Sequence, residues 1–365
     1  MKVLIASPYL AVMRGNSLTA LRIQRSIQAL QTSTDMNIDV IDYHTTESIN
    51  EAYDFLHILN PVRFIQSPLL KQIQQLAIHY GVTFTGTDVN EHLDHHDSRV
   101  VDLLNKASFI TVFHNQARDK VVNFSPEVAN NVHVVPQGFY RLEEPYSVHG
   151  TIDTAKLLEQ LQRDRQEGFR VAVLPAGIRK VKRVPWAIEL VTRFNQRNQQ
   201  KLKLYIVGPT IEQEEQAKIE LQIHKSQDVT YLGELPQGIV LKIVEHADVL
   251  LNSSSSEGQS IAIIEAFHMR TPVVASKCPG NEQMIIHGKN GYLFLNESEF
   301  VESLQRIICD QSKTEELVDE AYRIAQMNYS AMHEAKQYLA LYKADLCSSG
   351  ALTQVNLSRT CSVEI

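Results

Sequence analysis

Short apolar runs alternate with longer amphipathic segments along most of this sequence of 365 residues. An apolar run bounded by polar residues or glycine is typical of a buried strand, and the segments between such runs have helical spacing. Strands that alternate with helices form βαβ units, in which helices cover both faces of a parallel sheet. The sequence therefore predicts an α/β fold. The predicted strands are residues 2–7, 38–43, 55–60, 82–85, 109–113 and 132–135, then 170–175, 203–207, 229–232, 248–252 and 272–275, with one helix expected over 64–80.

The alternation lapses into a polar stretch between about residues 138 and 168, which indicates a domain boundary. A chain of this length commonly forms two domains, and Gln137-Gly138 could act as the hinge. The last helical segment has no strand left to pair with, so we expect it to cross back and pack on the first domain. The predicted organisation is residues 1–145 as a first Rossmann-like domain, 146–168 as a linker with a charged helix, 169–329 as a second Rossmann-like domain, 330–346 as the crossover helix and 347–365 as a disordered tail.

The composition is that of an ordinary soluble protein, with a formal net charge of -7 and 44% hydrophobic residues. No basic tract argues for nucleic-acid binding, and no apolar run approaches the ~20 residues needed to cross a bilayer. Residues 1–9 lack a signal-peptide cleavage signature, so we expect a strand there. The four cysteines show no CxxC pattern, which favours reduced thiols. We expect a cytoplasmic protein without a transmembrane segment or a nucleic-acid partner. The sequence leaves its oligomeric state open.

Histidines and aspartates gather in one short polar segment that contains His92, Asp94, His95, His96 and Asp97. Such a run is more often a solvated surface than a zinc site. The sequence also lacks the HExxH, GxSxG and P-loop patterns. We therefore expect no bound metal.

A polar loop of serines follows the predicted strand 248–252 and leads into a helix. It carries two carboxylates, Glu257 in the loop and Glu265 in the second turn of the helix. The first-turn N–H groups of a helix have no intrahelical acceptor and attract phosphate. The pattern predicts an anion site with two carboxylates beside it.

A cluster of cations follows the predicted strand 170–175, in the run Gly177-Ile178-Arg179-Lys180-Val181-Lys182-Arg183. A solvated charged loop is the commoner explanation of such a cluster. Here the loop lies at the carboxyl edge of the same sheet as the helix start described above, where doubly wound sheets bind ligands. Arg179 and Lys182 would then hold a diphosphate together with that helix.

Two loops of the first domain are further candidates. Gly15 and Asn16 follow the first strand and let the backbone come close to a ligand, although Ser17 would equally fit a simple helix cap. Asp88 follows the predicted strand 82–85, where it would contact substrate or handle a proton. A capping role for Asp88 is the alternative.

Several motifs around these residues occur together. Besides the Glu-x7-Glu pair of Glu257 and Glu265, they are Ser256-Glu257-Gly258, Ala266-Phe267, Thr271-Pro272-Val273-Val274-Ala275 and Asn290-Gly291-Tyr292-Leu293-Phe294. This set closely resembles the donor half of family 4 glycosyltransferases, retaining enzymes of the GT-B architecture that use nucleotide sugars without a metal. Further motifs are similar to the glycosyltransferase 1 domain-containing protein group, and some of them also to selenosugar synthases. They are Arg14-Gly15-Asn16, Gly86-Thr87-Asp88, Gly177-Ile178-Arg179-Lys180-Val181-Lys182, Val207-Gly208-Pro209, Leu232-Gly233-Glu234 and Pro279-Gly280-Asn281.

The resemblance implies a GT-B fold, with two Rossmann-like domains facing across a cleft, and a role for each matching residue. Glu265 would bind the ribose and Glu257 the transferred sugar, while Arg179 and Lys182 would neutralise the diphosphate. Asp88 stands where many relatives have a histidine near the donor sugar. The remaining donor-binding residues implied are Gly258, Gln259, Ser260 and Ile261 through their backbone, Gly15 and Asn16 near the β-phosphate, Gly177 and Gly208 at strand ends, and Leu232 and Glu234 near the base.

The function implied is a metal-independent retaining glycosyltransferase that needs no cofactor beyond its nucleotide-sugar co-substrate. A uridine diphosphate (UDP) sugar is the donor expected by family habit, and the acceptor is not identified. Two alternatives are a selenosugar synthase, in which selenophosphate attacks the donor, and a catalytically silent nucleotide-sugar-binding protein.

Overall fold

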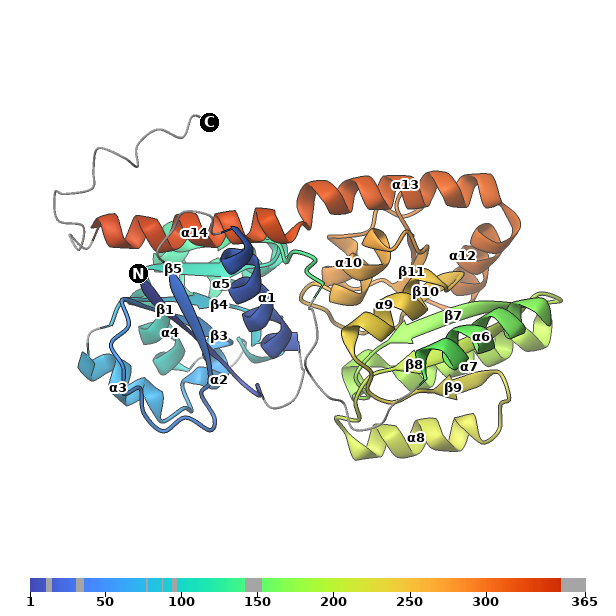
Figure 1. Cartoon of the computed structure of the whole chain (residues 1–365), viewed down its shortest axis with the longest axis horizontal. Coiled ribbons are helices and arrows are strands. Elements are labelled where there is room, and N and C mark those ends of the chain that lie inside the picture. Colours follow the sequence, from blue (N-terminus) through green and yellow to red (C-terminus); the bar gives the residue numbers. More distant parts are fainter. Residues whose placement is uncertain are drawn as a thin grey trace. The chain divides into compact units, whose positions relative to one another are not determined.

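The structure is a computed structural model and describes residues 1–10, 15–30, 36–76, 78–86, 88–93, 97–141 and 153–348. The chain forms two compact units, the first comprising Met1–Gly138 and Ala331–Ile365 and the second Phe139–Ser330. Each unit contains a six-stranded sheet in which all neighbouring strands are parallel. The predicted GT-B arrangement of two Rossmann-like sheets is confirmed (Figure 1).

The first unit has the strand order β2-β1-β3-β4-β5-β6. Successive residues of β1 point to opposite faces of the sheet, so Val3 and Ile5 enter one core cluster while Leu4 and Ala6 enter another. The strands are β1 Lys2–Ser7, β2 Asn37–Asp42, β3 Phe55–Leu59, β4 Tyr80–Thr83, β5 Phe109–Val112 and β6 Val132–Val134. The helices are α1 Gly15–Leu30, α2 Pro61–Phe64, α3 Leu69–Leu76, α4 Ser98–Asn105, α5 Asn115–Phe124 and α14 Ala331–Ser348, with short π- and 3-10 turns η1 Asp88–His92 and η2 Pro126–Asn131.

The single helix expected over residues 64–80 is wrong. The chain instead forms α2 and α3, with Ser67 and Pro68 between them. A proline cannot supply a backbone N–H for a continuing helix, and the Ser67 hydroxyl accepts the Leu69 N–H at 3.2 Å where the next helix begins. The following strand, β4, accordingly begins at Tyr80 rather than at residue 82.

The second unit has the strand order β12-β11-β10-β7-β8-β9. Its strands are β7 Phe169–Pro175, β8 Lys201–Val207, β9 Val229–Tyr231, β10 Val249–Asn252, β11 Val273–Ser276 and the short β12 Tyr292–Phe294, which was not predicted. The helices are α6 Thr154–Gln166, α7 Val184–Arg197, α8 Gln213–Ile223, α9 Gln237–Glu245, α10 Ile261–His268, α11 Pro279–Glu282, α12 Glu297–Cys309 and α13 Gln311–Asn328, with the 3-10 turn η3 Lys180–Lys182.

Residues 146–168 are expected from the sequence to form a linker. The part of this segment that the structure describes, residues 153–168, belongs to the second unit. Asp153 caps α6 by accepting the Ala155 and Lys156 N–H groups, and Leu157 and Leu161 are buried in a core cluster that includes residues of β7. A charged helix with one apolar stripe thus covers the sheet. Residues 142–152 of the expected linker lie outside the described residues.

The predicted crossover of the last helix is confirmed, because α14 belongs to the first unit and lies beside α1 (Figure 1). Tyr338 and Tyr342 of α14 are fully buried. Their hydroxyls join a hydrogen-bonded network with His57 of β3 and Thr83 of β4. Burial lowers the pKa of His57 to about 3, so the ring is neutral at physiological pH. Helix α14 reaches Ser348, and the rest of the predicted tail, 349–365, lies outside the described residues.

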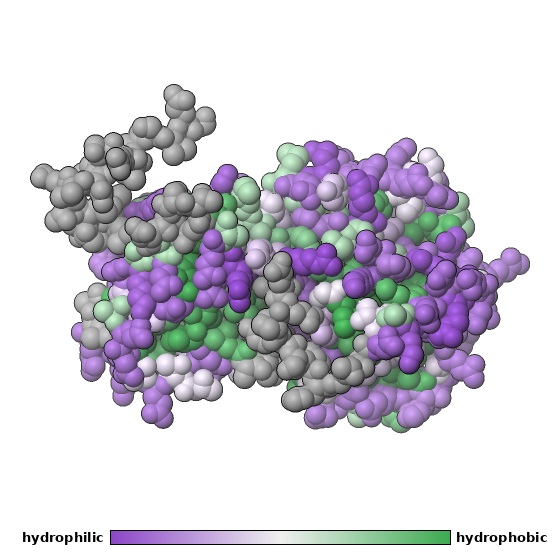
Figure 2. Space-filling view, in the orientation of Figure 1, coloured by the Kyte–Doolittle hydropathy of each residue, from purple (hydrophilic) through white to green (hydrophobic). Residues whose placement is uncertain are grey.

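The outer surfaces drawn in Figure 2 are largely hydrophilic, with hydrophobic side chains gathered in smaller areas. In the part of the chain that the structure describes, no helix combines the length and the apolar character that membrane spanning requires.

One buried ion pair fixes α14 on α1. The Arg22 guanidinium donates to both carboxylate oxygens of Glu334, at 2.7 and 2.9 Å, and the two side chains are 5% and 0% exposed. Gly138 N–H also donates to Glu334 at 3.0 Å, and Arg22 to the Gln137 side chain at 3.1 Å. Both segments that connect the first unit to the second, 137–138 and the start of α14, are thereby held by one charge pair.

Replacing one partner of this pair should destabilise the first unit. Glu334→Ala leaves the Arg22 charge buried and unpaired, so we expect the free energy of unfolding to fall by about 3–5 kcal/mol. Urea unfolding followed by circular dichroism measures this. The surface pair of Arg99 and Asp97 is the control, since Arg99→Ala should cost no more than ~1 kcal/mol. Equal losses in both variants would contradict the assignment, and Arg22→Met combined with Glu334→Leu should recover part of the loss.

Candidate functional site

The six strands of the second unit all end at the same edge of the sheet, because all of them are parallel. Two loops leave this edge next to each other. We name residues 177–183, which follow β7, the basic loop, and residues 253–260, which follow β10, the serine loop. Strands β7 and β10 are direct neighbours. The sequence predicts both loops at the same sheet edge, and the strand order makes them direct neighbours.

Hydrogen bonds tie the basic loop to the serine loop. Ser255 N–H donates to the Val181 carbonyl at 2.8 Å, and the Ser253 hydroxyl donates to the Lys182 carbonyl at 2.7 Å. In return, Arg183 Nε donates to the Ser253 carbonyl at 2.8 Å. Arg183 has a left-handed backbone, with φ of 46°, and its guanidinium lies 4.1 Å from the ring centre of Trp186. The Arg183 side chain therefore has a structural role, since it holds the basic loop against the serine loop.

The centre of the two loops is a buried salt bridge. Lys182 Nζ lies 2.7 Å from Glu257 Oε1, and the side chains are 17% and 8% exposed. The same oxygen accepts hydrogen bonds from Ser254 Oγ at 2.6 Å and Asn252 Nδ2 at 3.1 Å. Burial alone would raise the pKa of Glu257, but the charge of Lys182 and these hydrogen bonds outweigh it and hold the pKa below 4.5. Glu257 is a carboxylate at neutral pH.

Arg179 is a half-buried cation of the basic loop. Its Nε is buried, and within the described part of the chain it donates to no acceptor. A buried N–H without an acceptor is unfavourable by about 1–3 kcal/mol, and more when the group is charged. An anionic ligand at this place would supply the missing acceptor.

Three glycines allow backbones to approach closely at this edge. A Cβ at Gly208, whose φ is +149°, would lie 2.2 Å from the Ala176 carbonyl oxygen. One at Gly177 would lie 2.6 Å from Cδ1 of Ile211, and one at Gly280 would lie 2.4 Å from the Glu257 carbonyl oxygen. Gly177 and Gly208 thus have a packing role. Their predicted contact with a ligand, through the backbone, stays a prediction.

Helix α10 starts at Ile261 with Ser260 as its N-cap residue, but the Ser260 side chain makes no capping hydrogen bond. Within the described part of the chain, the first-turn amides thus have no cap from the Ser260 side chain, and an anionic ligand could accept from them. Gln259 and Ser260 are buried, while Gly258 is half-buried. These four residues, from Gly258 to Ile261, form the end of the serine loop and the helix start.

Glu265 lies on the next turn of α10 and is 6% exposed. Its Oε1 accepts a hydrogen bond from Gln237 Nε2 at 2.8 Å, at the first residue of α9. The chain between β9 and α9 contains Leu232 and Glu234, both half-buried. The sequence analysis missed Gln237 and also Asn252. An amide ending the otherwise apolar run 249–252 is the one signal that could have drawn attention to Asn252.

The candidates of the first unit are Gly15, Asn16 and Asp88. Gly15 is exposed at the start of α1, with no atom within 4 Å of a built Cβ, and Asn16 is half-buried. Asp88 is fully buried, and its carboxylate accepts the N–H groups of Thr85 and Gly86 at 2.8 to 3.0 Å. Burial raises the pKa of Asp88 to about 6, although these hydrogen bonds lower it. The geometry is that of the capping alternative, in which Asp88 organises its own loop.

Some candidate positions lie outside the described residues, namely Arg14, Thr87, Asp94, His95 and His96. Among the residues that are described, no group of three or more histidine, cysteine, aspartate or glutamate side chains has an arrangement that could hold a metal ion.

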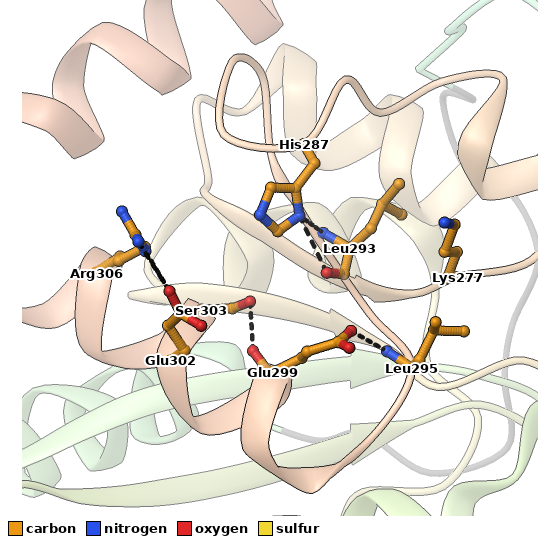
Figure 3. A pocket seen from close by; sticks show the side chains of 8 residues that line it. All are labelled: Lys277, His287, Leu293, Leu295, Glu299, Glu302, Ser303 and Arg306. Atoms are coloured by element: carbon orange, nitrogen blue, oxygen red, sulfur yellow. Dashed lines mark hydrogen bonds and ion pairs between the residues drawn. The ribbon is translucent and has the colours of Figure 1, made fainter.

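A pocket of about 300 Å³ lies elsewhere in the second unit, between the ends of β11 and β12 and helix α12 (Figure 3). Its charged groups are largely paired within the protein: Glu302 binds Arg306, and Glu299 accepts the Leu295 N–H. None of the predicted donor-binding residues lines it. The lining residues are Lys277, His287, Leu293, Leu295, Glu299, Glu302, Ser303 and Arg306.

Comparison with known proteins shows what the chain resembles. Residues 159–324 match the model of the glycosyl transferases group 1, and this range contains both loops, Glu257 and Glu265. The matched region lies within the second unit, which is therefore similar to the group 1 glycosyl transferases. It is 27% identical over 345 residues to glycosyltransferase 1 domain-containing protein 1 of Xenopus tropicalis, an alignment that covers 91% of this chain and 96% of the relative. The predicted resemblance to family 4 glycosyltransferases is confirmed.

Two solved structures share the fold. HepE of Anabaena, in complex with UDP-glucose, superposes with a TM-score of 0.72 at 17% identity, covering 94% of this chain and 100% of HepE. The sucrose-phosphate synthase of Thermosynechococcus elongatus superposes with a TM-score of 0.73 at 14% identity, covering 95% of this chain and 100% of that one.

Removing the Lys182 charge should reverse how stability depends on pH. In the native protein the pKa of Glu257 is lowered, so its contribution is present above about pH 4.5 and lost as the pH falls through the folded-state pKa. In Lys182→Met, burial dominates and raises that pKa, so stability is lost as the pH rises through it. We expect the variant to be less stable by about 3 kcal/mol at neutral pH, and by less at about pH 4.

Urea unfolding followed by the fluorescence of Trp186, the single tryptophan of the chain, measures this in the second unit. Lys180→Met is the matched control, because Lys180 is an exposed cation of the same loop. A stability difference between the native protein and Lys182→Met that stays constant over this pH range would contradict the role of the salt bridge.

Proposed function

We propose that this glycosyltransferase transfers a sugar, with retention of configuration, from a UDP-sugar to an acceptor without a metal ion. The observation that carries the proposal is the unpaired, buried Nε of Arg179 beside the Lys182–Glu257 salt bridge and the open start of α10. These groups together offer a cation, backbone donors and a carboxylate at one sheet edge. That combination suits a nucleoside diphosphate that carries a sugar.

The donor is oriented by two carboxylates in this proposal. Glu265, which Gln237 holds at 2.8 Å, accepts hydrogen bonds from the ribose hydroxyls. Glu257 accepts hydrogen bonds from the hydroxyls of the transferred sugar. Leu232 and Glu234 border the base, and the backbone of residues 258–261 binds the diphosphate. UDP is the proposed nucleotide because the HepE structure, which shares the fold, holds UDP-glucose.

The chemical step breaks the bond between the anomeric carbon and the β-phosphate oxygen and forms a bond from that carbon to an acceptor hydroxyl. Negative charge appears on the departing phosphate, where Arg179, Lys182 and the positive end of the α10 dipole stabilise it. The acceptor attacks from the face that the phosphate leaves, and its proton passes to the phosphate. Retention of configuration follows without a protein base.

The residues of the first unit enter the proposal as a second set of contacts. Gly15 and Asn16, at the start of α1, are the proposed contacts to the β-phosphate from that unit. Asp88 accepts the backbone N–H groups of Thr85, Gly86 and Val89 in the loop that follows β4. We propose that it positions this loop next to the donor sugar.

Replacing Glu265 tests the proposal. Each hydrogen bond to a charged acceptor contributes about 1.5–3 kcal/mol, so Glu265→Ala should weaken UDP-glucose binding by roughly 10–100-fold. Isothermal titration calorimetry measures the affinity, and nucleotide release measures turnover. Glu245→Ala, which changes an exposed glutamate at the end of α9, is the control and should leave both unchanged.

Normal UDP-glucose binding and normal nucleotide release in Glu265→Ala would overturn the assignment of this site. A thermal-shift screen of UDP, GDP and ADP sugars on the native protein identifies the nucleotide, since a ligand that binds only the folded state raises the melting temperature. Nucleotide release that requires selenophosphate would favour a selenosugar synthase instead.

A further inference from the structure

Asn252 is a buried amide that touches both parts of the proposed donor site. It ends strand β10 and is 5% exposed. Its Nδ2 donates to Glu257 Oε1 at 3.1 Å and to Ser260 Oγ at 3.2 Å. Its Oδ1 accepts the Ser254 N–H at 3.1 Å. One side chain thus connects Glu257, the proposed sugar-binding carboxylate, with Ser260, the N-cap residue of α10.

Asn281 fixes which way the Asn252 amide points. Asn281 is fully buried, and its Nδ2 donates to the Ser276 carbonyl at 2.9 Å. A backbone carbonyl only accepts, so this atom must be the nitrogen. The same Nδ2 lies 3.1 Å from Asn252, whose atom there must be Oδ1. The nitrogen of Asn252 then faces Glu257 and Ser260, an orientation set by the protein before any ligand binds.

This orientation changes what Ser260 does. A serine at an N-cap position usually accepts an N–H of the first helical turn, but Ser260 makes no such bond. Its oxygen accepts from Asn252 instead, and within the described residues its hydroxyl has no acceptor. The hydroxyl proton therefore remains available at the helix start, on a side chain that is 4% exposed.

We propose that Asn252 is a positioning residue that orients Glu257 toward the donor sugar and makes the Ser260 hydroxyl a hydrogen-bond donor to the diphosphate. The proposal rests on the proposed function of this site. It adds a side-chain donor to the backbone donors of the helix start. The Asn252 amide would also link the sugar contact of Glu257 to the phosphate contact of Ser260, so both contacts depend on Asn252.

The first test uses Ser260. Ser260→Ala removes the hydroxyl and should weaken UDP binding by about 10-fold, because a hydrogen bond to a charged group is lost. Ser260→Thr keeps a hydroxyl and should restore most of the affinity. Ser256→Ala, in the same loop, is the matched control. Titration with uridine, which lacks the phosphates, should show no difference between Ser260→Ala and the native protein.

The second test uses Asn252→Asp. This change keeps an oxygen acceptor toward Asn281 and Ser254 but places a second carboxylate oxygen against Glu257. We expect kcat/KM for UDP-glucose to fall by about 100-fold at pH 8. The loss should shrink as the pH falls toward 5.5, because a proton shared by the two carboxylates restores a donor. A purely structural defect would lower kcat/KM without this pH-dependent recovery.

The outcomes separate this proposal from the proposed function. If the native protein neither binds UDP nor turns over UDP-glucose, the proposed function fails. If the native protein does both, and Ser260→Ala binds UDP normally or Ser260→Thr gives no rescue, the positioning proposal fails alone. A loss of activity in Asn252→Asp that is the same at every pH also overturns it. If Asn252→Asp does not fold, the three serine variants decide the question.

Discussion

The salt bridge between Lys182 and Glu257 determines how the second unit can hold a negatively charged ligand. Glu257 is buried next to the start of α10, which is where a diphosphate would bind. Two unit charges of like sign 4 Å apart repel by about 4 kcal/mol at an effective dielectric constant of 20. Because Lys182 neutralises Glu257 at 2.7 Å, a carboxylate for the sugar and a phosphate can be neighbours. The two loops around this pair are hydrogen-bonded to each other, so the arrangement exists before a ligand arrives.

A second buried ion pair has a comparable role in the first unit. Arg22 holds Glu334 of α14 and the side chain of Gln137, which lies where the chain leaves this unit. In the second unit, where the chain has just entered it, Phe139 N–H donates to the Tyr329 carbonyl at 2.7 Å. The Phe139 ring stacks on His268 of α10 at 4.5 Å. The outgoing and the returning segments are thus hydrogen-bonded to each other within both units, which makes them one paired connection rather than two independent linkers.

The sequence predicts the layered architecture well because the hydrophobic spacing of buried parallel strands is a local property. Prediction from the sequence fails where the environment of a residue depends on contacts with residues distant in the chain. Leu157 and Leu161, for example, lie in a charged segment that the sequence predicts as a linker. In the structure they are buried in a core cluster together with residues of β7. The sequence indicates Asp88 as a candidate site residue but does not show which group its carboxylate contacts. In the structure the carboxylate accepts N–H groups of its own loop. Asn252 and Gln237 have no sequence signal of comparable strength, since only the folded structure shows that they contact Glu257 and Glu265.

The two glutamates of the Glu-x7-Glu pair are held in different ways, and the difference follows from what lies next to each. Glu257 is paired with a cation, whereas Glu265 accepts from the neutral amide of Gln237. In the proposed function Glu257 lies beside the diphosphate, where the charge of Lys182 compensates its own. Since the charge of Lys182 is already balanced by Glu257, the net positive charge for the diphosphate comes mainly from Arg179 and the α10 dipole. In the proposed function Arg179 is therefore the cation on which donor affinity depends most, whereas the sequence pattern assigns the diphosphate to Arg179 and Lys182 together.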